Sequence, residues 1–293
     1  MEGDDLDVVI VSYRSRELLR ACLDSLRRHP PAGPLKVIVV DNGSGDGTAE
    51  MIRGQYPEVE LIASPTNLGF AAATNLGART GSATFVLALN PDTAVTEGAL
   101  DTVLRALESH PEVAVVGPRL VRADGSLDHA AKRSFPTPLS ALGYFTGLGR
   151  RAGIRGRLAG YTAPDVEAGP VDAVNGAFML MRRSTFEAAG GFDEGYWMYM
   201  EDLDLCYRFD EARWVTWYEP SATVVHVKAG TTGPVRAPRL TYAFHYGMYR
   251  FYRKHYAAQK SRIVNAVVYA GIAVKAIGSI INSSAKRTVR AAD

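Results

Sequence analysis

Cysteine is scarce in this chain, which has only Cys22 and Cys206 among its 293 residues. Two cysteines so far apart are too few for the disulfide framework that stabilises small secreted domains. The first residues, MEGDDLD, also lack the basic segment and apolar segment of a secretory signal. Both absences favour a reducing compartment, and we expect the protein to act in the cytoplasm.

Three short motifs of common enzyme classes are missing as well. The end of the first predicted strand and the residues after it read VSYRSREL, which lacks the G-x-G-x-x-G of dinucleotide-binding folds. Neither the P-loop pattern G-x-x-x-x-G-K-[ST] nor the nucleophile elbow G-x-S-x-G occurs in the sequence. These absences argue against an NAD enzyme, a P-loop NTPase and a hydrolase with a serine elbow.

The first half of the sequence alternates apolar runs with amphipathic segments. The apolar runs predict strands over Asp7–Ser12, Leu35–Val40, Val59–Ala63, Thr84–Leu89 and Val113–Gly117, and the segments between them predict helices over Ser15–His29, Thr48–Gln55, Ala71–Arg79 and Glu97–His110. Strands that alternate with helices indicate an α/β fold, with a mostly parallel sheet and helices on both faces.

The second half is less regular. Lys132–Asp172 has no clear period, and a long irregular segment in a compact domain is usually functional or mobile. Beyond it the pattern predicts one buried strand over Ala173–Met181, a helix over Ser184–Ala189 that Ser184 caps, strands over Trp214–Tyr218 and Ala222–Val227, and helices from about Leu240 onward.

Acidic side chains stand where the sequence is otherwise apolar. Asp41 and Asp92 each follow a predicted strand, and the stretch MYMEDLDLCYR contains Glu201 and Asp202 together with Asp204. A buried charge needs a partner, a metal or a reaction that uses it. Because the carboxyl ends of parallel strands meet at one edge of a sheet, we expect a ligand site there. Carboxylates that merely cap turns are the alternative.

Two further strand ends offer metal ligands. Asn90-Pro91-Asp92 follows one strand, and His226 closes another. A divalent cation that bridges two phosphates takes only one or two protein carboxylates, and imidazole is an acceptable additional ligand. A turn at Asn90-Pro91 and a structural histidine are the alternatives.

The net charge of +2 hides a marked asymmetry. The chain from Arg236 onward has eleven Lys or Arg and one acid, hence +10, which leaves 22 basic and 30 acidic groups, hence −8, for the preceding part. A basic tail suggests an anionic partner, either nucleic acid or anionic lipid.

The apolar stretch Ile263–Ile281 favours lipid over nucleic acid. On a helical projection one side carries polar groups, at Asn265, Lys275, Ser279, Asn282 and Lys286, and the other carries Val264, Val267, Val268, Ala270, Val274, Ile277 and Ile281. This pattern predicts a helix that lies on a membrane surface rather than one that spans it. A helix packed on the domain or on a second subunit is the alternative.

Seven segments occur in an order that is typical of one enzyme family: VIVSYRS, VVDNGSGDGT, NLGFAAATNLG, LNPDT, NGAFMLMRR, GGFDEGYWMYMEDLDLCYR and VVHVKAG. From Asp7 to Gly233 the chain resembles the GT-A glycosyltransferases of family 2, in particular the bacterial rhamnosyltransferase-like branch. The resemblance implies a GT-A catalytic domain over 1–235, with a nucleotide-sugar half over about 1–122 and an acceptor half over about 123–235. Residues 236–293 would form a basic, membrane-associating tail.

The resemblance also implies roles for individual residues. Ser12, Tyr13 and Asp41 would line the base and ribose of a nucleotide sugar, and Asn67, Gly69 and Asn75 would lie near its ribose and diphosphate. Asp92 would hold Mg²⁺ or Mn²⁺ together with His226, while Asn90 stands where the family's D-x-D element has its first acid. Asp202 would be the catalytic base, and Glu201 would shape its environment or touch the acceptor.

The reaction implied is an inverting displacement at the anomeric carbon of a nucleoside-diphosphate sugar. It needs one base and a cation for the leaving diphosphate, and no carboxylate nucleophile. The branch suggests dTDP-L-rhamnose as donor and a cell-envelope glycan or polyprenyl-diphosphate-linked sugar as acceptor, at the cytoplasmic face of the plasma membrane. A hexose, galactofuranose or N-acetylhexosamine donor, and a non-catalytic nucleotide-sugar-binding protein on the same fold, are the alternatives.

Overall fold

Nine strands of the described part of the chain form the main, mixed sheet. A computed structural model describes residues 5–136, 167–227 and 237–290 of the chain. The strand order is β3 (Glu60–Ser64), β2 (Leu35–Asn42), β1 (Leu6–Ser12), β4 (Phe85–Leu89), β10 (Phe178–Arg182), β6 (Val113–Val121), β11 (Val215–His226) and β5 (Thr93–Val95), and β8 (Gly169–Val171) pairs with β11. The strands β1 to β4 are parallel, whereas β10 runs antiparallel to both of its neighbours.

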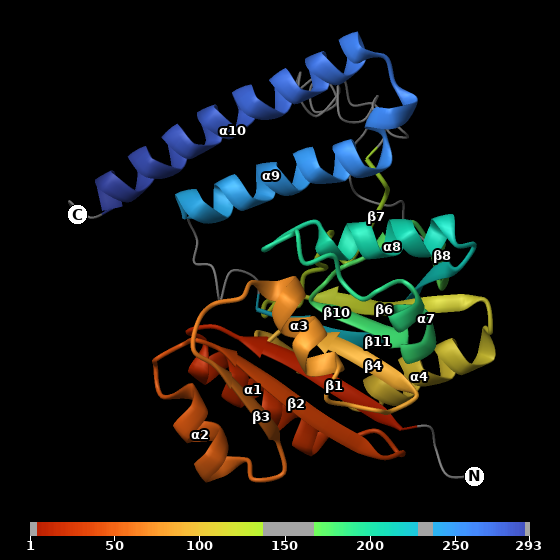
Figure 1. The fold of residues 1–293 in the computed structure, drawn as a ribbon. Helices are drawn as coiled ribbons and strands as arrows, with labels where there is room; N and C mark the ends of the chain where they lie inside the picture. Colours follow the sequence, from red (N-terminus) through yellow and green to blue (C-terminus); the bar gives the residue numbers. More distant parts are fainter. Residues whose placement is uncertain (1–4, 137–166, 228–236, 291–293) are drawn as a thin grey trace.

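Helices cover both faces of this sheet, which confirms the predicted α/β class (Figure 1). One face carries α1 (Arg16–Arg28), α2 (Thr48–Gln55) and α4 (Ala99–Ser109), and the other carries α3 (Phe70–Ala78), α7 (Arg183–Ala188) and α8 (Glu201–Glu211). Two C-terminal helices, α9 (Pro238–His255) and α10 (Arg262–Arg290), follow each other as a hairpin around the short 3₁₀ helix η1 (Ala257–Gln259) and lie beyond α8.

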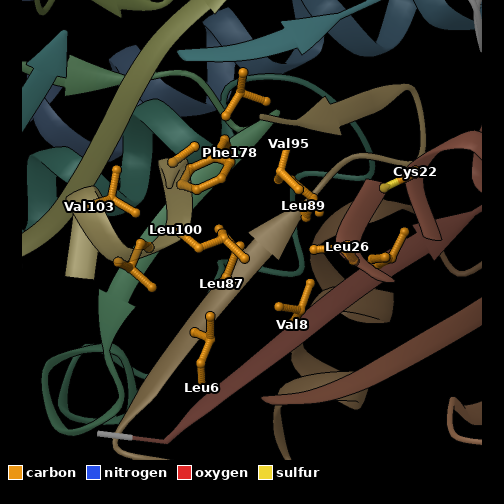
Figure 2. Packing of buried hydrophobic residues seen from close by; sticks show 14 of the residues in the cluster. Leu6, Val8, Cys22, Leu26, Leu87, Leu89, Val95, Leu100, Val103 and Phe178 are labelled. Carbon is orange, nitrogen blue, oxygen red and sulfur yellow. The ribbon is translucent and has the colours of Figure 1, made fainter. Parts of the chain in front are cut away.

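The two apolar clusters follow from the two-residue period of the strands. In β1, Val8 and Ile10 belong to the cluster under α1 and α4, whereas Val9 between them faces the cluster under α3 and α8. Figure 2 shows the first cluster, in which side chains of α1 and α4 meet those of the central strands. The sheet is therefore buried on both sides, and its loops at the carboxyl edge are held on a rigid support.

Several local predictions were wrong for identifiable reasons. The predicted strand Ala173–Met181 is two strands, because a turn at Asn175 separates β9 (Ala173–Val174), which pairs with β7 (Lys132–Arg133), from β10. The predicted pieces Trp214–Tyr218 and Ala222–Val227 form the single strand β11, with an irregularity between Glu219 and Thr223. Ser184 caps nothing, because α7 begins one residue earlier.

The helix α9 is part of the folded body through its contacts with α8. The buried carboxylate of Asp204 accepts hydrogen bonds from His255 Nε2 at 2.8 Å and from Arg208 Nε at 2.7 Å, and lies 2.8 Å from Lys254 Nζ. Burial opposes the charge of Asp204, but His255 and the cations hold the pKa of this carboxyl well below its usual value. The acidic cluster of α8 is thus partly structural: Asp204 fixes α9 against α8.

The outer surface of α10 is apolar. Ile263, Val267, Val274, Ile277 and Ile281 are exposed, whereas Asn265 on the opposite side bonds to Tyr252 of α9. Val268, predicted to lie on the exposed apolar side, is half-buried instead. In the described part of the chain, α10 has the one stretch, 262–282, that is long and apolar enough to cross a membrane by length and composition.

Candidate active site

The ends of β1 and β2 bring the first predicted site residues together. Ser12 and Asp41 are register partners in these parallel strands, and both are buried. Ser44 closes the loop behind them, because its backbone N–H donates to Asp41 Oδ1 at 3.2 Å and its hydroxyl donates to the carbonyl of Ser12 at 3.4 Å. Tyr13, which follows Ser12 in the chain, is half-buried. The carboxyl edge of the sheet therefore holds the Asp41 carboxylate in a fixed position beside Ser12.

The loop with Asn67 and Gly69 is held by Asn42, a residue that the sequence analysis did not single out. Asn42 accepts a hydrogen bond from the backbone of Leu68 at 2.8 Å, and its amide donates to Asn67 Oδ1 at 3.3 Å and to the carbonyl of Gly69 at 3.2 Å. Gly69 has φ +86°, and a Cβ there would lie 2.4 Å from the carbonyl oxygen of Trp197. Only glycine fits this close approach.

Asn75 links this loop region to the segment before α8. Its Oδ1 accepts from the backbone of Phe192 at 2.9 Å, while its Nδ2 donates to the Phe192 carbonyl at 2.8 Å and to Glu194 Oε1 at 3.0 Å. Both ends of the amide are thereby used within the protein. A diphosphate contact for Asn75 stays a prediction, and its observed contacts are those of a residue that positions two loops.

Asp92 and His226 meet because β5 pairs antiparallel with the end of β11. Thr93 and His226 are register partners, and Val227 donates its backbone N–H to the carbonyl of Asp92 at 2.8 Å. This pairing puts His226 Nε2 3.5 Å from Asp92 Oδ1. Asn90 lies at the start of the same turn, where its carbonyl accepts from the Thr93 hydroxyl at 2.7 Å.

Asp128, which the sequence analysis also missed, lies on the other side of the imidazole. Its Oδ2 is 3.3 Å from His226 Nδ1. Burial favours the neutral ring, but hydrogen bonds and charge from Asp128 and Asp92 outweigh it and raise the pKa of His226 to about 9. Asp128 follows a turn in the sequence and gave no sign of a link to a histidine far along the chain.

Asp92 and His226 together suit a divalent cation that takes most of its ligands from a bound phosphate group rather than from the protein. No group of three or more His, Cys, Asp and Glu side chains converges as a complete metal site within the described residues. Asp92 and His226 supply one carboxylate and one imidazole, both buried, which is the number a cation needs when phosphate oxygens complete its coordination.

The predicted base, Asp202, is held by a buried ion pair. Its Oδ2 accepts from Arg133 Nη2 at 2.5 Å and from the backbone of Gly176 at 2.8 Å, and its Oδ1 accepts from the backbone of Leu203 at 2.7 Å. Arg133 also donates to the carbonyl of Val174 at 2.8 Å. Asp202 is therefore fixed in orientation, and a hydroxyl donor must share one of its oxygens or displace a donor.

Glu201, next in the chain, has a different environment. Burial, followed by the neighbouring charge of Asp202, raises the pKa of Glu201 to about 8. Its Oε2 is buried and has no hydrogen-bond partner among the described residues. Glu201 therefore favours its protonated form at neutral pH and can donate a hydrogen bond, whereas the neighbouring Asp202 side chain is paired with the Arg133 guanidinium.

The backbone before these carboxylates is strained. Tyr199 and Met200 both have positive φ, at 71° and 74°, which is uncommon for residues other than glycine. Gly247 of α9 packs on this turn, since a Cβ there would lie 2.9 Å from Met200 Cγ and 3.0 Å from the Tyr199 carbonyl oxygen. The helix α9 therefore supports the turn that aims Glu201 and Asp202.

The comparisons with known proteins agree with this geometry. The sequence profile described as glycosyl transferase family 2 matches residues 7–190. The N-acetylglucosaminyl-diphospho-decaprenol L-rhamnosyltransferase of Mycobacterium tuberculosis is 36% identical over 261 residues, which cover 85% of this chain and 84% of that protein. The rhamnosyltransferase WbbL of Escherichia coli K12 is 27% identical, covering 75% of this chain and 82% of the relative.

Solved structures give the fold independently. A mannosyltransferase from Pyrobaculum calidifontis, in complex with GDP-Man and Mn²⁺, superposes with a TM-score of 0.60 at 16% identity, covering 100% of this chain and 76% of the other. The extent of the profile match and the identity to the mycobacterial relative show the family. The chain belongs to glycosyltransferase family 2 and is a GT-A glycosyltransferase of the rhamnosyltransferase-like kind.

Proposed function

We propose that this enzyme transfers L-rhamnose, with inversion, from dTDP-rhamnose to a polyprenyl-diphosphate-linked sugar. The observation that carries the proposal is the 36% identity to the mycobacterial rhamnosyltransferase, because it extends over 85% of this chain and 84% of that protein. The printed name of that relative specifies both the sugar transferred and a lipid-linked acceptor.

In the proposed reaction Asp202 is the base. An acceptor hydroxyl gives its proton to the carboxylate while its oxygen forms a bond to the anomeric carbon, and the bond from that carbon to the diphosphate oxygen breaks. Arg133 and the Gly176 backbone hold Asp202 in place. Glu201, largely protonated at neutral pH, would donate a hydrogen bond to the acceptor or the sugar. No covalent sugar–enzyme intermediate is needed.

On the donor side, Asp41 and Tyr13 would receive the nucleoside at the ends of β1 and β2, and the loop of Asn67 and Gly69 would lie along the ribose and diphosphate. Asp92 and His226 would hold Mg²⁺ or Mn²⁺. Such a cation supplies positive charge that stabilises the leaving diphosphate. The Mn²⁺ named for the mannosyltransferase neighbour supports this role.

We also propose that the tail beyond the catalytic part docks on the cytoplasmic face of the membrane. The exposed apolar side of α10, with Val267, Val274 and Ile277, would enter the interfacial layer. The basic residues of 236–293 would add electrostatic attraction to anionic lipid. Docking there would bring the site to a lipid-linked acceptor.

A donor screen tests the proposal. Purified enzyme is given dTDP-rhamnose, UDP-galactofuranose, a UDP-hexose or UDP-N-acetylglucosamine, with a polyprenyl-diphosphate N-acetylglucosamine acceptor and Mg²⁺ or Mn²⁺. We expect release of dTDP with dTDP-rhamnose only, and a product whose anomeric configuration is opposite to the donor's. Turnover with another donor would overturn the choice of sugar. Nucleotide binding without any transfer would favour a non-catalytic protein.

A further inference from the structure

We propose that Asp128 is a positioning residue of the metal site, which fixes the tautomer and orientation of His226 so that Nε2 faces Asp92. The two carboxylates lie on different nitrogens of one ring: Asp128 Oδ2 is 3.3 Å from Nδ1, and Asp92 Oδ1 is 3.5 Å from Nε2. The inference rests on the proposed function in one respect, namely that Asp92 and His226 hold a cation.

Asp128 is itself rigidly held. The residue is buried, and its Oδ1 accepts a hydrogen bond from the backbone of Ala130 at 3.1 Å. Its own backbone N–H donates to the carbonyl of Leu120 in β6 at 2.9 Å, and its carbonyl accepts from Ala131 at 2.9 Å. The Oδ2 atom that faces His226 therefore has a fixed position relative to the sheet, as a positioning residue requires.

The chemistry of the pair selects one tautomer. An ionised carboxylate can only accept hydrogen bonds, so Asp128 keeps a proton on Nδ1 of His226. At neutral pH the raised pKa of His226 leaves protons on both nitrogens of the metal-free ring. A cation would displace the proton on Nε2, the nitrogen beside Asp92, while Asp128 retains the one on Nδ1. Histidines that bind metals usually donate their other N–H to a carboxylate, a backbone carbonyl or water, and Asp128 is the carboxylate in that position here. The same arrangement explains why Asp92, Asp128 and His226 do not converge on one ion: Asp128 faces Nδ1, on the side of the imidazole ring away from Asp92.

Asp128→Asn tests this assignment sharply. The backbone N–H of Ala130 still needs the side-chain oxygen, so the new amide nitrogen would face Nδ1 and donate to it. The ring would then carry its proton on Nε2, where it blocks a metal. We expect the affinity for Mn²⁺ with nucleoside diphosphate, measured by calorimetry, to fall roughly 10–100-fold. Asp128→Ala imposes no donor on Nδ1, so its loss should be smaller than that of Asp128→Asn.

The proposal predicts that Asp128→Asn loses more Mn²⁺ affinity than Asp128→Ala. If the pair of Asp128 and His226 were merely structural, Asp128→Ala would be the more damaging change. ¹⁵N NMR of the metal-free protein, at a pH where the ring is neutral, should show the proton on Nδ1 in the wild type and on Nε2 in Asp128→Asn. Asp124→Asn is the matched control, because Asp124 is exposed in the turn just before Asp128 and its carboxylate accepts hydrogen bonds from Ser126; it should change neither measurement.

Three outcomes would overturn the inference. If the wild type binds Mn²⁺ and Asp128→Asn binds it with the same affinity, Asp128 has no positioning role, but the proposed metal site at Asp92 and His226 is unaffected. A greater loss in Asp128→Ala than in Asp128→Asn, or an unchanged tautomer, would give the pair a structural role only. A wild-type protein that binds nucleotide without any Mn²⁺ would overturn the proposed metal site and this inference together.

Discussion

The buried pair of Arg133 and Asp202 makes a quantitative prediction about stability. Arg133 Nη2 and Asp202 Oδ2 are 2.5 Å apart, and each side chain is 10% exposed. Removing one member of such a pair leaves the other charge buried without compensation, which costs about 3–5 kcal/mol. We therefore expect Arg133→Gln to lower the free energy of unfolding by that amount, and to reduce transfer because Asp202 loses its fixed orientation.

The exposed pair of Arg27 and Glu58 is a matched control. Its Nε–Oε1 distance is 2.6 Å, but the two side chains are 44% and 52% exposed, and an exposed pair contributes only about 0–1 kcal/mol. Urea unfolding at constant pH measures both effects as changes in midpoint at constant slope. Combining Arg133→Gln with Asp202→Asn should cost clearly less than the sum of the single changes. Additive costs, or a cost for Arg133→Gln no larger than that for Arg27→Gln, would refute this reasoning.

Three further predictions concern the acid pair, the metal and the tail. The pKa of Glu201 is raised from 4.5 to about 8 in the folded protein. Between these two pH values the folded state therefore retains a proton that the unfolded state releases. The contribution of Glu201 to the free energy of unfolding consequently falls as the pH rises from 4.5 to 8. Glu201→Gln cannot titrate and should gain stability over the wild type from pH 4.5 to 8 in urea unfolding; parallel profiles would contradict the assignment. Asp92→Ala and His226→Ala should each weaken Mn²⁺-dependent nucleotide binding in calorimetry, and unchanged affinity in both would exclude a shared metal site. Deleting Arg262–Asp293 should preserve donor binding but abolish flotation with anionic liposomes. A full-length protein that does not bind liposomes at low salt would refute docking. If only detergent, and not high salt, releases the full-length protein from membranes, the helix spans the bilayer instead.

Most of the fold could be predicted from the sequence, because the hydrophobic period distinguishes strands from helices and their alternation along the chain indicates the α/β class. Strand ends at Asp41 and Asp92 could be placed at one edge, since parallel strands put their carboxyl ends together. The small strand β5, Thr93–Val95, was not predicted, because three residues are too short for a period. Yet this strand is what brings His226 to Asp92, so the meeting of the two predicted metal ligands follows from a pairing that no local pattern reveals.

The partners of the predicted residues were harder to find than the residues themselves. Arg133 and Asp128 lie at the edge of an irregular segment, and each meets a side chain that is distant in the chain, Asp202 and His226 respectively. A single buried contact of this kind leaves no periodic signal. Predictions that fall on residues 137–166 and 228–236 lie outside the described residues. Long-range polar pairing, rather than secondary structure, was therefore the main thing missing from the sequence-based account.

The rate of sugar transfer by the Asp202→Asn variant is the most direct test of the central claim, which is that Asp202 is the catalytic base. The variant and the wild type are compared with dTDP-rhamnose, a lipid-linked acceptor and Mg²⁺, and nucleotide affinity is measured in parallel by calorimetry. If Asp202 removes the acceptor proton, the variant should bind nucleotide like the wild type but transfer sugar at least about 100-fold more slowly. Transfer at near wild-type rates with normal nucleotide binding would contradict the account and remove Asp202 as the base.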